Sequence, residues 1–188
     1  VMTGIGDYPM KETMAAIDLL KQENSDIRIR TVCISALTST GIGRGGYCMN
    51  KDEFDDYFTY EKPVIFNFHG YPETMKAILF SYLINPERFD IRGYVEQGST
   101  TTPFDMHVRN NTSRYHLVMA AYDALAKSGR VSQEDATRIH EKYEAKIAEN
   151  TEYIKKHGID QPGLEDWVWP AARHQEKAVE EAWHGQTN

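Results

Sequence analysis

Residues 63–72 read Pro63-Val64-Ile65-Phe66-Asn67-Phe68-His69-Gly70-Tyr71-Pro72, and they carry the clearest structural signal in the chain. The apolar run at 63–68 has the length and the bulky residues of a buried strand. Proline at 72 suits the first turn of a helix, whose apolar face would carry Met75, Ile78, Leu79 and Tyr82. A strand that passes directly into a helix predicts a βα unit with parallel strands.

The rest of the chain repeats this alternation of strands and helices. Strands are predicted at 1–5, 27–34 and 89–95, and helices at about 9–22, 50–58, 112–127 and 134–156. The strand at 27–34 begins by alternating isoleucine with arginine. Ser132 and Asp135 form a capping box for the last helix, and the Trp167–Pro170 segment is expected to dock back onto the domain.

This pattern predicts one α/β domain of three layers over residues 1–170. Its sheet is expected to be mainly parallel, because strands alternate with helices. Residues 171–188 form a charged tail. Because the chain opens within a strand, it suggests a fragment of a longer protein.

Composition narrows the classes of partner. The chain has 188 residues and a net charge of -7, from 28 acidic and 21 basic residues, so a nucleic-acid partner is disfavoured. It shows neither a membrane-spanning apolar run nor a signal-peptide pattern, which predicts a soluble, cytoplasmic protein without a membrane partner. Cys33 and Cys48 lack the spacing of a disulfide framework or a zinc site.

Hydroxyl side chains gather before a helix start at residues 96–106. This stretch reads Glu96-Gln97-Gly98-Ser99-Thr100-Thr101-Thr102-Pro103-Phe104-Asp105-Met106. Thr102 is expected at the N-cap, Pro103 at the first helical position, and Asp105 three residues past the cap, so that Thr102 and Asp105 satisfy unpaired amides. The amides of Ser99, Thr100 and Thr101 could then hold a phosphate or carboxylate. The alternative is a tight turn that caps itself and packs against another domain.

His69 and Tyr71 lie where the strand at 63–68 passes into its helix, at the carboxyl edge where open α/β sheets place their sites. The strand at 89–95 should end at the same edge. We therefore expect a shared rim that binds an anion or contacts another domain. It comprises His69, Tyr71, Gly98, Ser99, Thr100, Thr101 and Thr102. His69 could act there as an acid or base, or could be structural.

Other chemical motifs are weak. The Gly41–Gly46 segment satisfies GxGxxG but neither follows a strand directly nor opens a helix, so we interpret it as a loop. Ser99, His69 and Asp105 could form a hydrolase triad, yet Ser99 lacks the GxSxG elbow. The histidines show no metal-ligand spacing, so no metal site is predicted. His107, Arg109 and Arg114 could add positive charge near the helix that begins at 103.

Residues 62–72 and 92–106 strongly resemble the C-terminal domain of phosphoketolase. The resemblance extends from Gly4-Ile5-Gly6-Asp7 through 52–58 and Arg114-Tyr115-His116-Leu117-Val118 to Asp166-Trp167-Val168-Trp169-Pro170, about 170 residues in all. Residues 39–50 depart from it, because a glycine-rich loop replaces the family's more polar loop.

The resemblance implies the fold of a transketolase C-terminal domain, with a mainly parallel (mixed) sheet of about five strands and helices on both faces. It also implies a parent enzyme that uses thiamine diphosphate and Mg²⁺. Such enzymes cleave xylulose 5-phosphate, fructose 6-phosphate or both with phosphate, giving acetyl phosphate and an aldose phosphate. It also implies a homodimer and two upstream domains that bind the cofactor. For this chain it implies no catalytic residue, no metal and no cofactor of its own, and a role in packing, dimerisation or regulation. The alternative is a phosphate- or nucleotide-binding regulatory module at Gly98–Thr102.

Overall fold

The computed structural model describes residues 1–37, 48–80, 82, 85–95, 98 and 100–170. Four strands form its sheet: β1 (Met2–Ile5), β2 (Thr31–Cys33), β3 (Val64–Phe68) and β4 (Phe89–Gly93). Their order is β2-β1-β3-β4, and every neighbouring pair is parallel. The α/β class is confirmed. The described sheet has four parallel strands where about five in a mixed sheet were expected, and β2 covers only the end of the predicted strand at 27–34.

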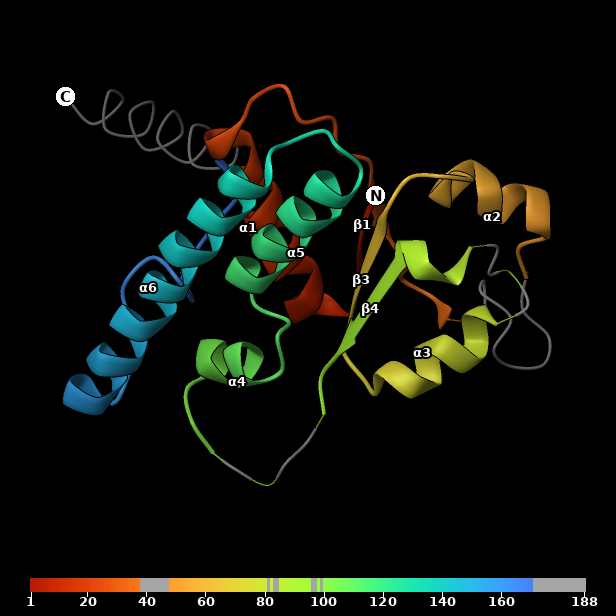
Figure 1. The fold of residues 1–188 in the computed structure, drawn as a ribbon. Coiled ribbons are helices and arrows are strands. Elements are labelled where there is room, and N and C mark those ends of the chain that lie inside the picture. Colours follow the sequence, from red (N-terminus) through yellow and green to blue (C-terminus); the bar gives the residue numbers. More distant parts are fainter. Residues whose placement is uncertain (38–47, 81, 83–84, 96–97, 99, 171–188) are drawn as a thin grey trace, which may run out of the picture.

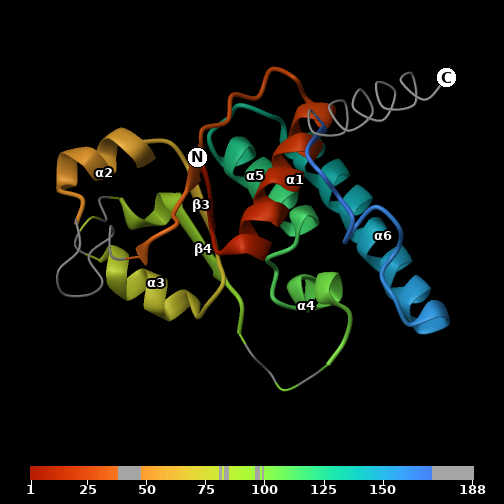
Figure 2. The ribbon, with the colours of Figure 1, turned by 180° about the vertical axis from the view of Figure 1, so that it is seen from behind.

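Helices cover both faces of the sheet, as predicted (Figure 1). α2 (Lys51–Phe58) and α3 (Pro72–Leu79) lie on one face, and α1 (Asp7–Glu23) and α5 (Arg114–Lys127) lie on the other. α6 (Gln133–His157) packs outside α1 and α5, as the view from behind shows (Figure 2). The short helices η2 (Pro86–Arg88) and α4 (Pro103–Arg109) complete the described elements. None of the described helices is long and apolar enough to cross a membrane.

The alternation of side chains along the strands divides the hydrophobic core in two. Met2 and Ile65 point to the face of α1 and α5, where they join a cluster that includes Leu20 and Leu117. Phe66 is one of the strand residues that point to the other face, against the aromatic side chains of α2. All five residues of β3 are buried, because this central strand is covered on both faces.

A buried ion pair ties α1 to α5. Glu12 accepts hydrogen bonds from the backbone N (2.8 Å), Nε (3.0 Å) and Nη2 (2.6 Å) of Arg114. The Nη2 of Arg114 also donates to the carbonyl of Leu164 at 2.8 Å, and its guanidinium lies 5.7 Å from the ring of Trp167. The predicted docking of the segment around Trp167 is therefore confirmed, and a charged side chain anchors it.

Candidate functional site

The carboxyl ends of the parallel strands meet at one edge of the sheet, and α3 begins there (Figure 1). β1 is followed by Gly6, the N-cap of α1, which has a φ of 96°. A Cβ atom at this position would lie 2.7 Å from the Cβ of His69. Only glycine therefore allows the turn after β1 to lie so close to the end of β3. The backbone N of His69 donates to the carbonyl of Ile5 at 2.9 Å, which fixes the end of β3 beside the end of β1.

Four rings gather at this edge and form what we call the carboxyl-edge cluster: Tyr8, His69, Tyr94 and His107. The rings of Tyr8 and His107 are stacked with centroids 4.1 Å apart. The centroid of the Tyr94 ring lies 5.4 Å from that of His107 and 5.5 Å from that of His69. The exposed ring of His69 contacts His107 edge-on at 6.3 Å. The four residues come from α1, α4 and the turns after β3 and β4.

The buried members of the cluster are uncharged at neutral pH. Burial lowers the pKa of His107 to about 4, and His69 and Lys11 act in the same direction. The Nδ1 of His107 lies 2.8 Å from the Oγ1 of Thr112, which fixes the ring. Burial also raises the pKa of Tyr8, whose hydroxyl donates to Glu165. Neutral, fixed rings suit packing against another surface better than proton transfer.

The predicted rim residues are placed as follows. Tyr71 is 53% exposed and precedes α3 without a side-chain cap, so its ring faces solvent. Gly98 has a φ of 69°, a conformation that favours glycine. Ser99 lies outside the described residues, as do the GxGxxG loop and the tail, so the Ser99 hydrolase hypothesis stays untested. Thr100, Thr101 and Thr102 line a separate cavity of about 720 Å³, the threonine cavity, whose lining includes neither His69 nor Tyr71.

Thr102 and Pro103 take the N-cap and first helical positions of α4, as predicted, but the predicted capping bonds are wrong. The Oγ1 of Thr102 donates to Asp160 at 2.8 Å, and Asp160 accepts from the backbone N of Phe104 at 3.2 Å. Asp105 instead accepts from the Oγ1 of Thr101 and pairs with Arg109, both at 2.8 Å. The cap of α4 is thus a carboxylate from a segment 58 positions away.

Asp160 occupies the place that an anion would take. It is 9% exposed and also accepts from the Nδ2 of Asn150 at 2.8 Å, so its position is fixed by three donors. Among the described residues, the lining of the threonine cavity contains Asp160, Glu165 and Asp166 and no lysine or arginine. The phosphate site at Gly98–Thr102 stays a prediction, and this acidic lining opposes it electrostatically.

The three residues that were expected to add positive charge near α4 do not provide it. His107 is neutral at pH 7 because its pKa is lowered to about 4 by burial. Arg109 is neutralised by Asp105, and Arg114 is buried in its ion pair with Glu12. These side chains stabilise the fold instead of attracting an anion.

Sequence reasoning missed Tyr8, Tyr94, Asp160 and Glu165. Glu165 connects the two regions, because it accepts from Tyr8 and from the Nζ of Lys11 and also lines the threonine cavity. Tyr94 directly follows β4, so the rule that strand ends share an edge could have found it. Asp160 and Glu165 carry no local signal, because their partners lie far away in the sequence.

Comparison with known proteins gives a consistent result. Residues 1–169 match the family model described as the XFP C-terminal domain. Probable phosphoketolase 2 of Nostoc sp. is 38% identical over 171 residues, covering 90% of this chain and 21% of that protein. The probable phosphoketolase of Brucella abortus is 38% identical over 170 residues, and that of Mesorhizobium japonicum is 39% identical over 172, each again covering 90% of this chain.

The chain spans about a fifth of the length of these curated relatives, at their C-terminal end. The matched region contains β1 to β4, the carboxyl-edge cluster and the Asp160 cap, so the described domain is the part that is shared. The chain therefore belongs to the XFP C-terminal domain family, the C-terminal domains of phosphoketolases.

Proposed function

We propose that this chain is the C-terminal part of a cytoplasmic, thiamine-diphosphate-dependent phosphoketolase. The longer enzyme would cleave xylulose 5-phosphate, fructose 6-phosphate or both with inorganic phosphate, giving acetyl phosphate and an aldose phosphate. The observation that carries this proposal is the match of residues 1–169 to the family. Because the chain spans only about a fifth of its relatives, the activity would belong to the longer protein.

The cofactor is assigned to upstream domains of the same polypeptide. The diphosphate of thiamine diphosphate is held through Mg²⁺, which needs several oxygen ligands. Within the described residues no group of three or more His, Cys, Asp or Glu side chains is arranged to hold a metal ion. These residues do not fit the group, and we assign none of them a role in binding it.

For the domain itself we propose a packing role, between domains or between subunits of a homodimer. The carboxyl-edge cluster supports this role, because the fixed, neutral ring of His107 contacts the exposed ring of His69, and the exposed Tyr71 follows two residues later. Exposed aromatic side chains on a rigid base are typical of the centre of a protein interface. The acidic threonine cavity beside it would favour a basic partner surface.

A chimera tests the proposed function. The matching C-terminal fifth of probable phosphoketolase 2 from Nostoc sp. would be replaced by residues 1–170 of this chain. Acetyl phosphate would be measured by hydroxamate formation with xylulose 5-phosphate, phosphate, thiamine diphosphate and Mg²⁺. We expect activity from the chimera and from the parent, and none from the truncated parent or from this chain alone.

Each other outcome has a definite meaning. Turnover by the isolated chain would contradict the assignment of catalysis to upstream domains. A truncated parent as active as the intact one would refute the packing role. If the intact Nostoc protein were inactive with both sugar phosphates, the proposed phosphoketolase activity would lose its support.

A further inference from the structure

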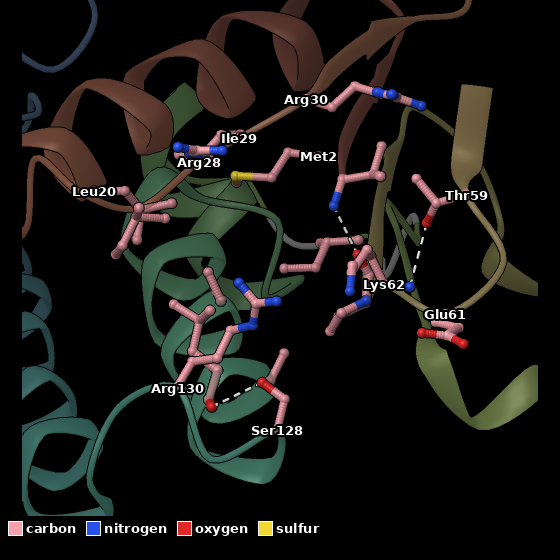
Figure 3. A pocket seen from close by; sticks show the side chains of 17 residues that line it. Met2, Leu20, Arg28, Ile29, Arg30, Thr59, Glu61, Lys62, Ser128 and Arg130 are labelled. Carbon is pink, nitrogen blue, oxygen red and sulfur yellow. Dashed lines mark hydrogen bonds between the residues drawn. The ribbon is translucent and has the colours of Figure 1, made fainter. Parts of the chain in front are cut away.

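A cavity of about 410 Å³ lies at the opposite, amino-terminal edge of the sheet (Figure 3). Its volume is within the range of cavities that bind small molecules. It is formed by the first residues of β1, segment 27–30 after α1, segment 59–63 after α2, and the end of α5 with Ser128 and Arg130. We call it the amino-edge cavity. It shares no lining residue with the carboxyl-edge cluster or the threonine cavity.

The floor of the amino-edge cavity is apolar. It consists of Met2, Leu20, Ile27, Ile29, Ile65, Ala121, Ala124 and Leu125. Met2, Leu20 and Ile65 belong to the hydrophobic cluster between the sheet and α1 and α5, so the cavity opens onto the core itself. A bound apolar group would therefore contact fixed, well-packed side chains.

Segment 27–30 shows why the cavity is apolar inside and charged at its mouth. Ile27 and Ile29 are half-buried, whereas Arg28 and Arg30 are exposed. This alternation turns the isoleucines toward the core and leaves both arginines on the solvent side, with the guanidinium of Arg30 held by carbonyls at the end of α2. The backbone here lies outside β2, although the sequence pattern predicts a strand. The alternating residues 27–30 therefore form the wall of a cavity and not part of the sheet.

Cations surround the opening. Arg28, Arg30, Lys62 and Arg130 line it, and Glu61 is the one acidic residue among the described residues of its lining. Figure 3 shows Arg28 and Arg30 on one side of the space and Arg130 and Lys62 on the other. The local excess of three positive charges is unusual in a chain whose net charge is -7. It is the reverse of the threonine cavity, whose described lining contains three acids and no lysine or arginine.

These cations keep their charge unneutralised within the described part of the chain. None of the four takes part in an ion pair with a described carboxylate. Arg30 donates instead to the backbone carbonyls of Asp56 and Tyr57, which orient it without cancelling its charge. Like charges gathered around an apolar cavity repel one another, and an anion would relieve that repulsion.

We propose that the amino-edge cavity binds a small organic anion with an apolar body. Its phosphate or carboxylate head is held by Arg28, Lys62 and Arg130, and its body packs on the floor beside Ile29 and Leu125. Guanidinium groups suit both head groups, because they present paired N–H donors. A small molecule fits better than an extended peptide, because the cavity is compact and has cations on two sides. The proposal does not depend on the phosphoketolase assignment.

A pair of fluorescent probes tests this site on the 188-residue chain. 1-Anilinonaphthalene-8-sulfonate is an organic anion with an apolar body, and N-phenyl-1-naphthylamine is its neutral counterpart. We expect the double variant Arg28→Ala/Arg130→Ala to bind the anionic probe about tenfold more weakly. Binding of the neutral probe should change less than about twofold, because the floor is intact.

Two further variants locate the binding. Lys127→Ala/Lys156→Ala removes the same charge from exposed positions outside the cavity, and it should leave both affinities unchanged. Ala124→Leu fills part of the floor and should weaken both probes. Circular dichroism and thermal melts would show that each variant is folded before its binding is compared.

Competition identifies the head group. Hexyl phosphate and hexanoate, each at the ionic strength of a sodium chloride control, should displace the anionic probe. The compound that displaces it at the lower concentration identifies the preferred head group, phosphate or carboxylate. Equal binding by the wild type and Arg28→Ala/Arg130→Ala would overturn the proposal. The proposal would also be overturned if the two organic anions displaced the probe no better than sodium chloride or hexanol. The cations around the amino-edge cavity would then form only a packing surface.

Discussion

His107 is a residue that folding holds in its neutral form. Its pKa is lowered by burial to about 4, against about 6.5 in an unfolded chain. Between these values the unfolded state binds a proton that the folded state does not. Stability is therefore complete above about pH 6.5 and is lost as the pH falls toward 4. His116, whose pKa burial also lowers to about 4, adds to the same loss.

His107→Gln should remove one of these two contributions. Glutamine can still bond to Thr112, and it cannot be protonated. We expect the loss of stability between about pH 6.5 and pH 4 to become shallower by about 1.4 kcal/mol per pH unit. Urea unfolding at several pH values in this range measures it, with the exposed, distant His157→Gln as control. An unchanged slope would show that His107 is protonated in the folded protein.

The Glu12–Arg114 pair makes a second prediction at the level of single residues. Both residues are buried, at 0% and 3% exposure. Glu12→Ala leaves the guanidinium uncompensated in the core, so we expect the free energy of unfolding to fall by about 3–5 kcal/mol. Glu152→Ala is the matched control, because its pair with Lys155 is exposed, at 73% and 65% for the two side chains. That change should cost less than about 1 kcal/mol.

A double-mutant cycle separates the pair from general damage to the core. Arg114→Ala should also be costly, whereas adding it to Glu12→Ala should cost much less than it does alone, because the two charges are then removed together. Strictly additive losses in urea unfolding would argue against coupling between the two side chains.

At the level of secondary-structure elements, the sequence predicted those whose signals are local. The start of α3 at Pro72 is as predicted, and Ser132 accepts from the backbone N of Asp135 at 3.0 Å at the start of α6. The predicted cap of α4 was wrong, because the side chain of Thr102 bonds to Asp160 and not to an amide of its own helix. A cap from another segment depends on the tertiary fold, which no pattern within α4 can report.

The same distinction applies to the candidate site. His69 was found because a residue just after a strand lies at the carboxyl edge. Its neighbours Tyr8 and His107 come from α1 and α4, and their stacking depends on how these helices pack. The strand at 27–34 was overestimated, because alternation of isoleucine and arginine fits a cavity wall as well as a strand.

Asp160→Ala tests the remote cap of α4. It removes the acceptor for the backbone N of Phe104 and for Thr102, so we expect a loss of about 1–2 kcal/mol in unfolding free energy. Amide exchange at Phe104 should become faster, as measured by NMR. Asp26→Ala, at an exposed position after α1, is the control and should change neither quantity.

The predicted phosphate site at Gly98–Thr102 is tested on the wild type and on its threonine variants. Calorimetry should detect no phosphate binding to the wild type at Gly98–Thr102, because Asp160 and the acidic lining oppose it. Phosphate binding to the wild type that Thr101→Ala and Thr102→Ala weaken would contradict this expectation and restore the regulatory alternative.

At the level of the whole molecule, the two edges of the sheet differ in character. The carboxyl edge carries the fixed, neutral rings of Tyr8 and His107 beside an acidic cavity, and the amino edge carries cations that pair with no described carboxylate around an apolar cavity. Parallel strands make this possible, because all their carboxyl ends lie together and all their amino ends lie at the other side. One edge is thereby suited to packing and the other to binding an anion.

Tyr71→Ala tests the packing role of the carboxyl edge. Its side chain is 53% exposed, so the isolated chain should lose less than about 0.5 kcal/mol of stability. In the chimera with the Nostoc relative, the same ring would be part of an interface, where losing an aromatic contact costs about 1–4 kcal/mol.

Tyr57→Ala is the matched control, because Tyr57 is 54% exposed but lies on α2, away from the carboxyl edge. We therefore expect thermal melts of the isolated chain to be equal for both variants, whereas only Tyr71→Ala lowers the melting temperature and activity of the chimera. Equal behaviour of the two variants in the chimera would place the interface elsewhere.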